Sequence, residues 1–474
     1  MGACGIRLVC LLLQLTGLDR FVASSYGAQQ QVNHQVEQAI VDYQQHETER
    51  LAKDMPRKAI TMTQDETFTG GLCLVASDPV SNFIILEQLA QSRDQQAWND
   101  LIAPALDPLN CEVVLGVGPT FIQSTSDQAP GLLAYVEHVL GAHHSPDLFH
   151  VQHELSKAVC APMATKERAA DKTATEARER LDQLQVRLQN AGDQPDKRGP
   201  ARPLKAPMSL EQAQLALEAA SHEHQRLAQQ RKQVKESIRT IGQAYHFVDL
   251  ERGVRRNGQL IASDIRTQIQ AIRTVAEQEG LSQSCLDRID KAERVVPKMQ
   301  TTIEFVSGYV RQQVDQLDLT PTISFAMHAK LIPSYYLERV AQTSSVKNGN
   351  PLRELAEGLR APLFEPGGAL SQMSPKMQAL LHRQAKTLAE VFQRSSSNVE
   401  GRNGYLSLRN HQLRGLDRPR KRVCLTNIHN FFLTRSDGTT AAERFFGRKP
   451  RSMFAVILDS VELPPAPRSP KRLY

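Results

Sequence analysis

The chain has 474 residues, of which 41% are hydrophobic, 23% are charged and only 5% are aromatic. This length exceeds what one ordinary hydrophobic core can hold, which excludes a minimal binding module and favours several packed units. Seven scattered cysteines without a CxxC pair argue against a disulfide scaffold or a zinc ribbon. Residues 400–474 carry fifteen Lys or Arg against six Asp or Glu, and this surplus points to a polyanionic partner or to a solvated basic surface.

The N-terminus begins with Arg7 and an apolar run, residues 8–13, that looks like the start of a secretory signal. Gln14 interrupts the run, and Asp19 and Arg20 stand where a cleavage region is small and uncharged. No other stretch approaches the ~18 apolar residues of a membrane span. We therefore expect a cytoplasmic protein with no membrane partner.

Glycines at positions 17 and 27 divide the following sequence into three helical segments, with Ala23 where two helices would cross. This spacing is typical of a helix-turn-helix, but a helical hairpin that docks on the next domain explains it equally well. We predict a helical N-terminal region over residues 1–55.

Short β-type runs dominate residues 56–160, namely AITMTQDETF, GLCLVA, NFIILEQLA, EVVLGV and TFIQSTSD. Helical patterns over residues 97–106 and 130–140 follow the third and fifth runs. Strands therefore come first in a hairpin-like series and then alternate with helices. This order predicts an α/β domain with a mixed sheet.

Residues 161–394 have an almost entirely helical pattern. A charged helix is expected over 166–190, and Ser209 with Gln212 forms a capping box for a second long helix that runs towards Tyr245. These two helices suggest a coiled-coil-like arm joined by a basic loop. Shorter helices follow, with breaks expected at Gly258, Gly280, Pro297, Pro321 and Pro351. A last helix is expected from Ser374 to Arg394.

Three acidic residues stand at the ends or starts of these elements. Asp65 and Asp127 each end a β-type run, where an Asp alone is more often a turn former or a helix cap. Glu400 forms a possible capping box with Ser397, yet the nearby glycines at 401 and 404 would each weaken a purely structural helix by about 1 kcal/mol. These glycines suggest that something approaches the helix backbone closely.

A second group of polar residues is the histidine cluster His143, His144, His150 and His153. The last two are three positions apart, whereas a zinc-binding helix places its histidines four apart. We therefore prefer ordinary polar histidines to a zinc site. A nucleophilic serine has no support either, because the GxSxG motif does not occur.

Asp65, Asp127 and Glu400 together form a pattern that none makes alone. Two acids end strands of one small sheet, and the third opens a helix after a long insertion. Carboxylates so arranged hold two Mg²⁺ or Mn²⁺ ions in phosphodiester chemistry, because these hard cations prefer oxygen ligands.

The blocks DETF, ASDPVSNFIILE, STSDQAPGLL, DLFHVQHEL, SSSNVEGRNGYLSLRNHQ and SDGTTAAERFFG occur in an order that resembles bacterial insertion-sequence transposases with a ribonuclease H-like (DDE-type) core. The resemblance spans residues 64–154 and 395–447. It implies a catalytic and metal-binding triad of Asp65, Asp127 and Glu400. It also implies that the helices of 161–394 are an insertion ahead of the last catalytic helix, that residues 395–450 complete the core, and that 451–474 form a basic tail. Only 64 residues precede Asp65, fewer than a full terminal-repeat-binding region usually occupies.

The sequence thus predicts a nucleoid-associated DNA transposase that cleaves the ends of its element and transfers them to target DNA as a homo-oligomer. Asp65 and Asp127 would share one ion and Glu400 would help to hold the second. The residues expected to contact DNA are Asn398, Arg402, Arg418, Arg420, Lys421 and Arg422. The alternative is a non-catalytic DNA-binding or coiled-coil interaction protein, such as a decayed transposon copy.

Overall fold

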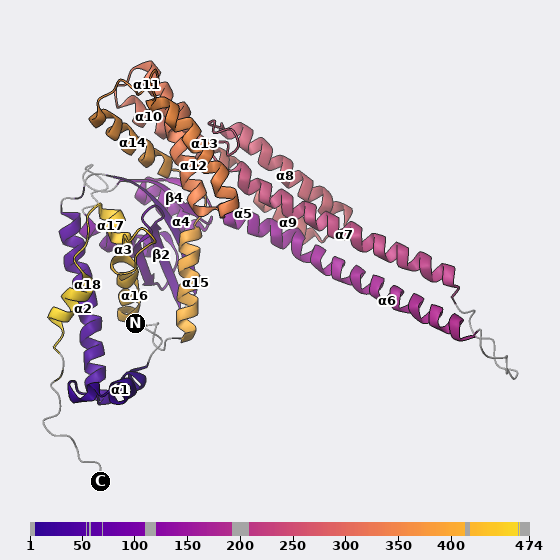
Figure 1. Cartoon of the computed structure of the whole chain (residues 1–474), viewed down its shortest axis with the longest axis horizontal. Helices are drawn as coiled ribbons and strands as arrows, with labels where there is room; N and C mark the ends of the chain where they lie inside the picture. Colours follow the sequence, from indigo (N-terminus) through magenta and orange to yellow (C-terminus); the bar gives the residue numbers. More distant parts are fainter. Residues whose placement is uncertain are drawn as a thin grey trace, which may run out of the picture. The chain divides into compact units, whose positions relative to one another are not determined.

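The computed structural model describes residues 5–53, 55, 58–68, 70–109, 120–191, 208–412, 418–462 and 464. The described chain is of mixed α/β class, with one five-stranded sheet and many helices (Figure 1). It divides into two compact units. The first holds Met1–Asp147, Leu250–Arg255 and Thr302–Tyr474, and the second holds Leu148–Asp249 and Arg256–Thr301. None of the helices in the described ranges is long and apolar enough to cross a membrane.

The sheet of the first unit has the strand order β3-β2-β1-β4-β5. Its strands are β1 (Ala59–Phe68), β2 (Leu72–Asp78), β3 (Phe83–Leu89), β4 (Thr120–Ser126) and β5 (His143–Pro146). The first three are antiparallel neighbours, whereas β4 and β5 run parallel to β1. Four strands coincide with predicted runs, and the predicted run at 112–117 lies outside the described residues. The sequence did not predict β5, because His-His-Ser-Pro has neither alternation nor β-branched residues.

Side-chain alternation gives the sheet two different faces. Met62 and Leu74 point into the large core of the first unit. Cys73 and Val75, which flank Leu74 in β2, form a small cluster with Val399 of α15 (Ser397–Gln412) on the opposite face. The odd-numbered positions of β1, which include Asp65, therefore face α15.

Helices cover the large-core face of the sheet. They are α2 (Tyr26–Ala52), α3 (Gln95–Leu106), α4 (Pro130–Tyr135) with the π-helical turn Val136–Leu140, α16 (Pro419–Phe431), α17 (Ala441–Phe446) and α18 (Met453–Ser460). Aromatic rings join them to the sheet, since Phe83 stacks on Phe445 at a centroid distance of 4.5 Å and meets Phe431 edge-on. This packing makes α16 and α17 part of the core.

The N-terminal region contains α1 (Ile6–Leu15), one 3₁₀ turn at Leu18–Arg20 and the 27-residue α2. Ser25 caps α2 by accepting a hydrogen bond from the main-chain nitrogen of Ala28, so Gly27 lies inside the helix instead of ending one. The middle helix of the proposed helix-turn-helix is thus reduced to a single turn. The phenolic hydroxyl of Tyr43 donates to the carbonyl of Arg451 at 2.6 Å, which ties α2 to the segment before α18.

The predicted insertion of residues 161–394 is divided between the two units. Residues 302–394 belong with the sheet and contain the end of α10 (Val296–Asp315), α11 (Pro321–Ala326), the π-helical turn Met327–Leu331, α12 (Ile332–Thr343), α13 (Val346–Phe364) and α14 (Pro375–Glu390). Pro351 lies within α13 rather than at a break. α14 begins at Pro375, as predicted, but ends four residues before Arg394.

The second unit is helical. It contains α5 (Leu148–Leu155) with the π-helical turn Ser156–Cys160, α6 (Ala161–Ala191), α7 (Leu210–Ala244), α8 (Gly258–Gln278), α9 (Gln283–Glu293) and the start of α10. The predicted capping box of Ser209 and Gln212 is present at the start of α7. α6 and α7 lie side by side (Figure 1), and the ion pair of Arg231 with Glu167, at 2.6 Å, joins them.

Candidate metal centre

The pairing of β1 with β4 contains an irregularity that decides which side chains share a face. Ile60 is opposite Phe121, but the next pair is Thr61 with Gln123, so one residue of β4 is skipped. Beyond this bulge the side chains of Gln123 and Thr125 point to the α15 side, where both donate to the carbonyl of Gln393. The bulge therefore re-aims the end of β4 towards the same face as Asp65.

The register then brings three acidic residues to one level of the sheet. Thr63 is opposite Thr125, so Asp65 and Asp127, two residues further along each chain, come level. Ser126 is opposite Pro146, so Asp127 is level with Asp147, the first residue after β5. Adjacent strands are about 4.8 Å apart, which places these acids side by side on three parallel neighbours.

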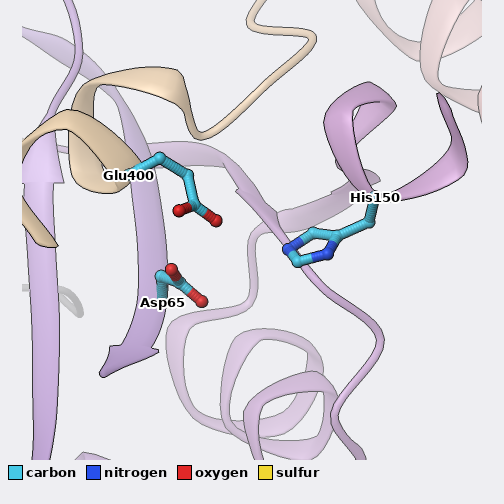
Figure 2. A group of neighbouring side chains, drawn as sticks. All are labelled: Asp65, His150 and Glu400. Atoms are coloured by element: carbon cyan, nitrogen blue, oxygen red, sulfur yellow. The ribbon is translucent and has the colours of Figure 1, made fainter. Parts of the chain in front are cut away.

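Glu400 reaches this edge from the first turn of α15. Asn398 anchors the helix, since it accepts a hydrogen bond from the Thr63 hydroxyl at 3.0 Å and donates to the Ser77 hydroxyl at 2.7 Å. A carboxylate oxygen of Glu400 and one of Asp65 lie within 4.8 Å of each other. Figure 2 shows the two carboxylates directed into the same space; His150, also drawn there, belongs to the second unit.

Asp147 was not predicted as a site residue. It is 2% exposed, its carboxylate accepts a hydrogen bond from the hydroxyl of Ser396, and the carbonyl of Ser396 accepts from the main-chain nitrogen of Glu400 at 3.0 Å. Asp147 thus holds Ser396, the residue immediately before the helix that carries Glu400. The sequence clue was an acid that directly follows a strand, but β5 itself had not been recognised.

The electrostatics of Asp65 reflect this crowding. The pKa of its carboxyl group is raised to about 8, first by burial and then by the charges of Glu400, Asp127 and Asp147, while a hydrogen bond from the main chain of Glu66 opposes the rise. The charges that act most strongly on Asp65 are therefore all negative. A divalent cation relieves such repulsion, which is the usual reason for gathering carboxylates in one place.

The oxygen atoms at this edge fit a hard cation. Asn403 donates from Nδ2 to Asp65 Oδ2 at 2.8 Å, and its own Oδ1 is buried with no hydrogen-bond partner among the described residues. Asp127 also serves the local turn, because its Oδ1 accepts from the main-chain nitrogen of Ala129 at 3.0 Å. Carboxylate and amide oxygens without sulfur ligands match Mg²⁺ or Mn²⁺.

Two histidines of the predicted cluster, His143 and His144, lie in the first unit and make ordinary polar contacts. His143 Nε2 lies 3.1 Å from the hydroxyl of Thr302, its ring stacks on Phe305, and burial lowers its pKa to about 4. His144 Nε2 lies 3.0 Å from the hydroxyl of Ser126.

Several residues predicted to contact DNA have structural partners within the fold. Arg402 forms a buried ion pair with Glu87 of β3, in which Nη2 lies 3.0 Å from Oε1. Asn398 is the anchor of α15 described above. Arg422 is 1% exposed and directs Nη1 at Cys73 Sγ at 3.2 Å. These groups stabilise the attachment of α15 and α16 to the sheet.

The remaining basic residues of the prediction lie at the start of α16. Arg418 is exposed at the N-cap, and Lys421 is half-buried in the first turn. Arg420 contacts His34 and Gln38 of α2. Most of the tail after residue 462 lies outside the described residues.

Comparison with known proteins gives one match. A family model described as a family of unknown function, DUF6399, matches residues 327–473. The matched segment includes Glu400 and Asn403 but none of the three strand-end acids, and it covers less than half of the chain. No curated protein and no solved structure matches the chain.

Proposed function

We propose that the protein is a metal-dependent DNA transposase, which cleaves strands at the ends of an insertion sequence and joins them to target DNA. One observation carries this proposal. Asp65, Asp127 and Asp147 are level on three neighbouring strands, and Glu400 brings a fourth carboxylate to within 4.8 Å of Asp65. Few tasks other than cation binding require such a cluster, since buried like charges destabilise a fold.

The sheet supports a ribonuclease H-like core for this enzyme. An antiparallel series of β1, β2 and β3 is followed by β4 and β5, which run parallel to β1. This is the order of hairpin and parallel strands that the sequence resemblance implies. The acids lie where the parallel strands end, and α15 with Glu400 crosses the same face.

In the proposed reaction Asp65 and Asp127 would hold one ion and Glu400 would help to hold the other. When bound, the ions supply an activated attacking oxygen and neutralise charge on the leaving oxygen. The oxygen of water bonds to phosphorus, the bond from phosphorus to the 3′ oxygen breaks, and that oxygen takes a proton. In strand transfer the freed 3′-hydroxyl attacks a target phosphodiester in the same way. Asn403 fixes the orientation of the Asp65 carboxylate, and the Ser396 contact with Asp147 positions Glu400.

The alternative of a non-catalytic DNA-binding or coiled-coil protein keeps the α6–α7 pair and the basic residues. It gives no reason to retain four acidic residues in one partly buried cluster. Transposases generally work as assemblies on paired DNA ends, so the proposal includes a homo-oligomer on DNA.

The test is strand cleavage of DNA that flanks the gene, with Mg²⁺ or Mn²⁺ added to the metal-free protein. We expect cleavage by the wild type, none in EDTA, and none by Asp65→Asn, which should still bind the DNA. The matched control is Asp437→Asn, since Asp437 is an exposed acid whose carboxylate caps a turn through Thr439. Cleavage that persists in EDTA or in the Asp65→Asn protein would refute the proposal, and binding without cleavage would favour the alternative.

A further inference from the structure

A pocket of about 650 Å³ lies in the first unit beside α15. Ser397, Gly401 and Tyr405 line it from the helix, and their spacing of four residues places them on one face. Glu400 and Asn403, which serve the metal centre, are not among the lining residues. The pocket and the carboxylate cluster therefore occupy different sides of the same helix.

The pocket is lined by positive charge. No Asp or Glu is among the described residues that form its wall, whereas four arginines are, namely Arg339, Arg394, Arg402 and Arg435. The ion pair with Glu87 neutralises Arg402. Arg339 directs its guanidinium at the carbonyls of Ala389, Glu390 and Phe392, so it builds the wall.

Arg435 is the exposed one of these arginines, and Arg394 is half-buried. The main chain of Arg435 is held in a tight turn, since its nitrogen donates to the carbonyl of Thr439 at 3.0 Å and its carbonyl accepts from Gly438 at 2.9 Å. Gly438 has φ = +79°, which glycine adopts without strain. The turn thus presents the Arg435 side chain from a fixed backbone position.

We propose that this pocket binds a backbone phosphate of a DNA strand, a few nucleotides from the one at the metal centre. An arginine fork matches phosphate oxygens in shape and charge. A helix with its side chains is about 10–12 Å wide, which equals roughly three nucleotides at about 3.4 Å each. A strand that passes over the start of α15 could therefore reach both sides. This inference rests on the proposed function, because it takes DNA as the ligand.

Gly401 allows a test that leaves the fold intact. A Cβ added at Gly401 meets no atom within 4 Å, and the same holds for Gly404, which is on the same helix but does not line the pocket. Gly401→Met should fill the pocket, and Gly404→Met is the matched control. The probes are a fluorescent single-stranded decanucleotide and thymidine monophosphate, titrated in EDTA. We expect Gly401→Met to weaken decanucleotide binding about tenfold, the effect of losing one charge-assisted contact, and Gly404→Met to leave it unchanged.

Arg435→Gln provides a second measurement. It should lower the log-log salt slope of decanucleotide binding by about 0.7, the value for one phosphate on a single strand. Arg383→Gln, an exposed arginine on α14, should not change the slope. Unchanged decanucleotide binding in both Gly401→Met and Arg435→Gln would overturn the inference. It is also overturned if these variants lose only thymidine monophosphate, since the pocket would then hold a free nucleotide. Because binding is measured without metal, a failure of strand cleavage would refute the proposed function and leave this result standing.

Discussion

Replacing Asp65 with Asn should stabilise the metal-free protein at neutral and alkaline pH. The folded state raises the pKa of this carboxyl group from 3.8 to about 8, first through burial and then through Glu400, Asp127 and Asp147. Because the folded pKa is the higher one, the folded state binds more protons between about pH 4 and pH 8. The free energy of unfolding therefore falls as pH rises through this range.

The size of the effect follows from the shift. A pH of 7 lies about three units above the ordinary pKa of 3.8 and still below the folded pKa, so the effect at pH 7 corresponds to at most ~4 kcal/mol at 1.36 kcal/mol per unit. Asn removes the charge and can still accept the hydrogen bond from Asn403 through its own amide oxygen. We expect the melting temperature at pH 8 in EDTA to rise by roughly 5–10 °C, given about 2–4 °C per kcal/mol for domains of this size.

The assay is thermal denaturation of both proteins from pH 4 to pH 9 in EDTA, repeated with Mg²⁺. The two curves should converge near pH 4, and Mg²⁺ should stabilise the wild type more than the variant. Asp437→Asn is a control with the opposite sign, since hydrogen bonds from Thr439 lower the pKa of Asp437. If Asp65→Asn is no more stable than the wild type at pH 8 in EDTA, the carboxylates do not repel one another as described, and the argument for a cation site fails.

Three further changes test the supports of the site. Ser396→Ala leaves the buried Asp147 carboxylate without its hydroxyl donor and should lower the free energy of unfolding, measured with urea, by about 1–3 kcal/mol. Ser397→Ala changes an exposed residue and should not lower it, so equal losses in the two variants would argue against the contact. Arg402→Met leaves the fully buried carboxylate of Glu87 without its ion-pair partner and should lower the free energy of unfolding by about 3–5 kcal/mol. The double variant with Glu87→Leu should restore most of this loss, and no recovery would show that the ion pair is not the cause. Deletion of residues 463–474 removes Arg468, Lys471 and Arg472 and should lower the log-log salt slope of duplex DNA binding by up to ~2.7, about 0.9 for each charge; an unchanged slope would show that the tail does not contact DNA.

The elements that local chemistry determines could be predicted from the sequence. The run AITMTQDETF alternates β-branched and apolar residues and gives β1 with its bounds. The Ser209 and Gln212 pair gives the start of α7. Gly27 was misleading, because the Ser25 cap two residues earlier begins α2 and the helix tolerates the glycine. Local patterns thus succeeded where capping and alternation act without competition.

The site depended on information that no local pattern contains. That Asp65 and Glu400 meet was expected from the order of motifs, although they are far apart in the chain. Asp147 and Asn403 were missed, because their roles follow from the register of β4 with β5 and from the rotation of α15. The basic residues were predicted from charge alone, and charge does not reveal that Arg402 and Arg422 are buried.

The separation of Asp147 from Glu400 in the sequence also determines when the carboxylate cluster can form during translation. A ribosome that adds about 5–20 residues per second needs roughly 13–50 seconds to synthesise the intervening segment. During this interval all five strands can pair, but the Cys73 and Val75 side of the sheet lacks its cover, because Val399 has not yet been made. The three strand-end acids likewise lack Glu400, which has not yet been synthesised. A chain still attached to its ribosome therefore leaves Cys73 and Val75 uncovered, and it acquires the complete carboxylate cluster only near the end of translation.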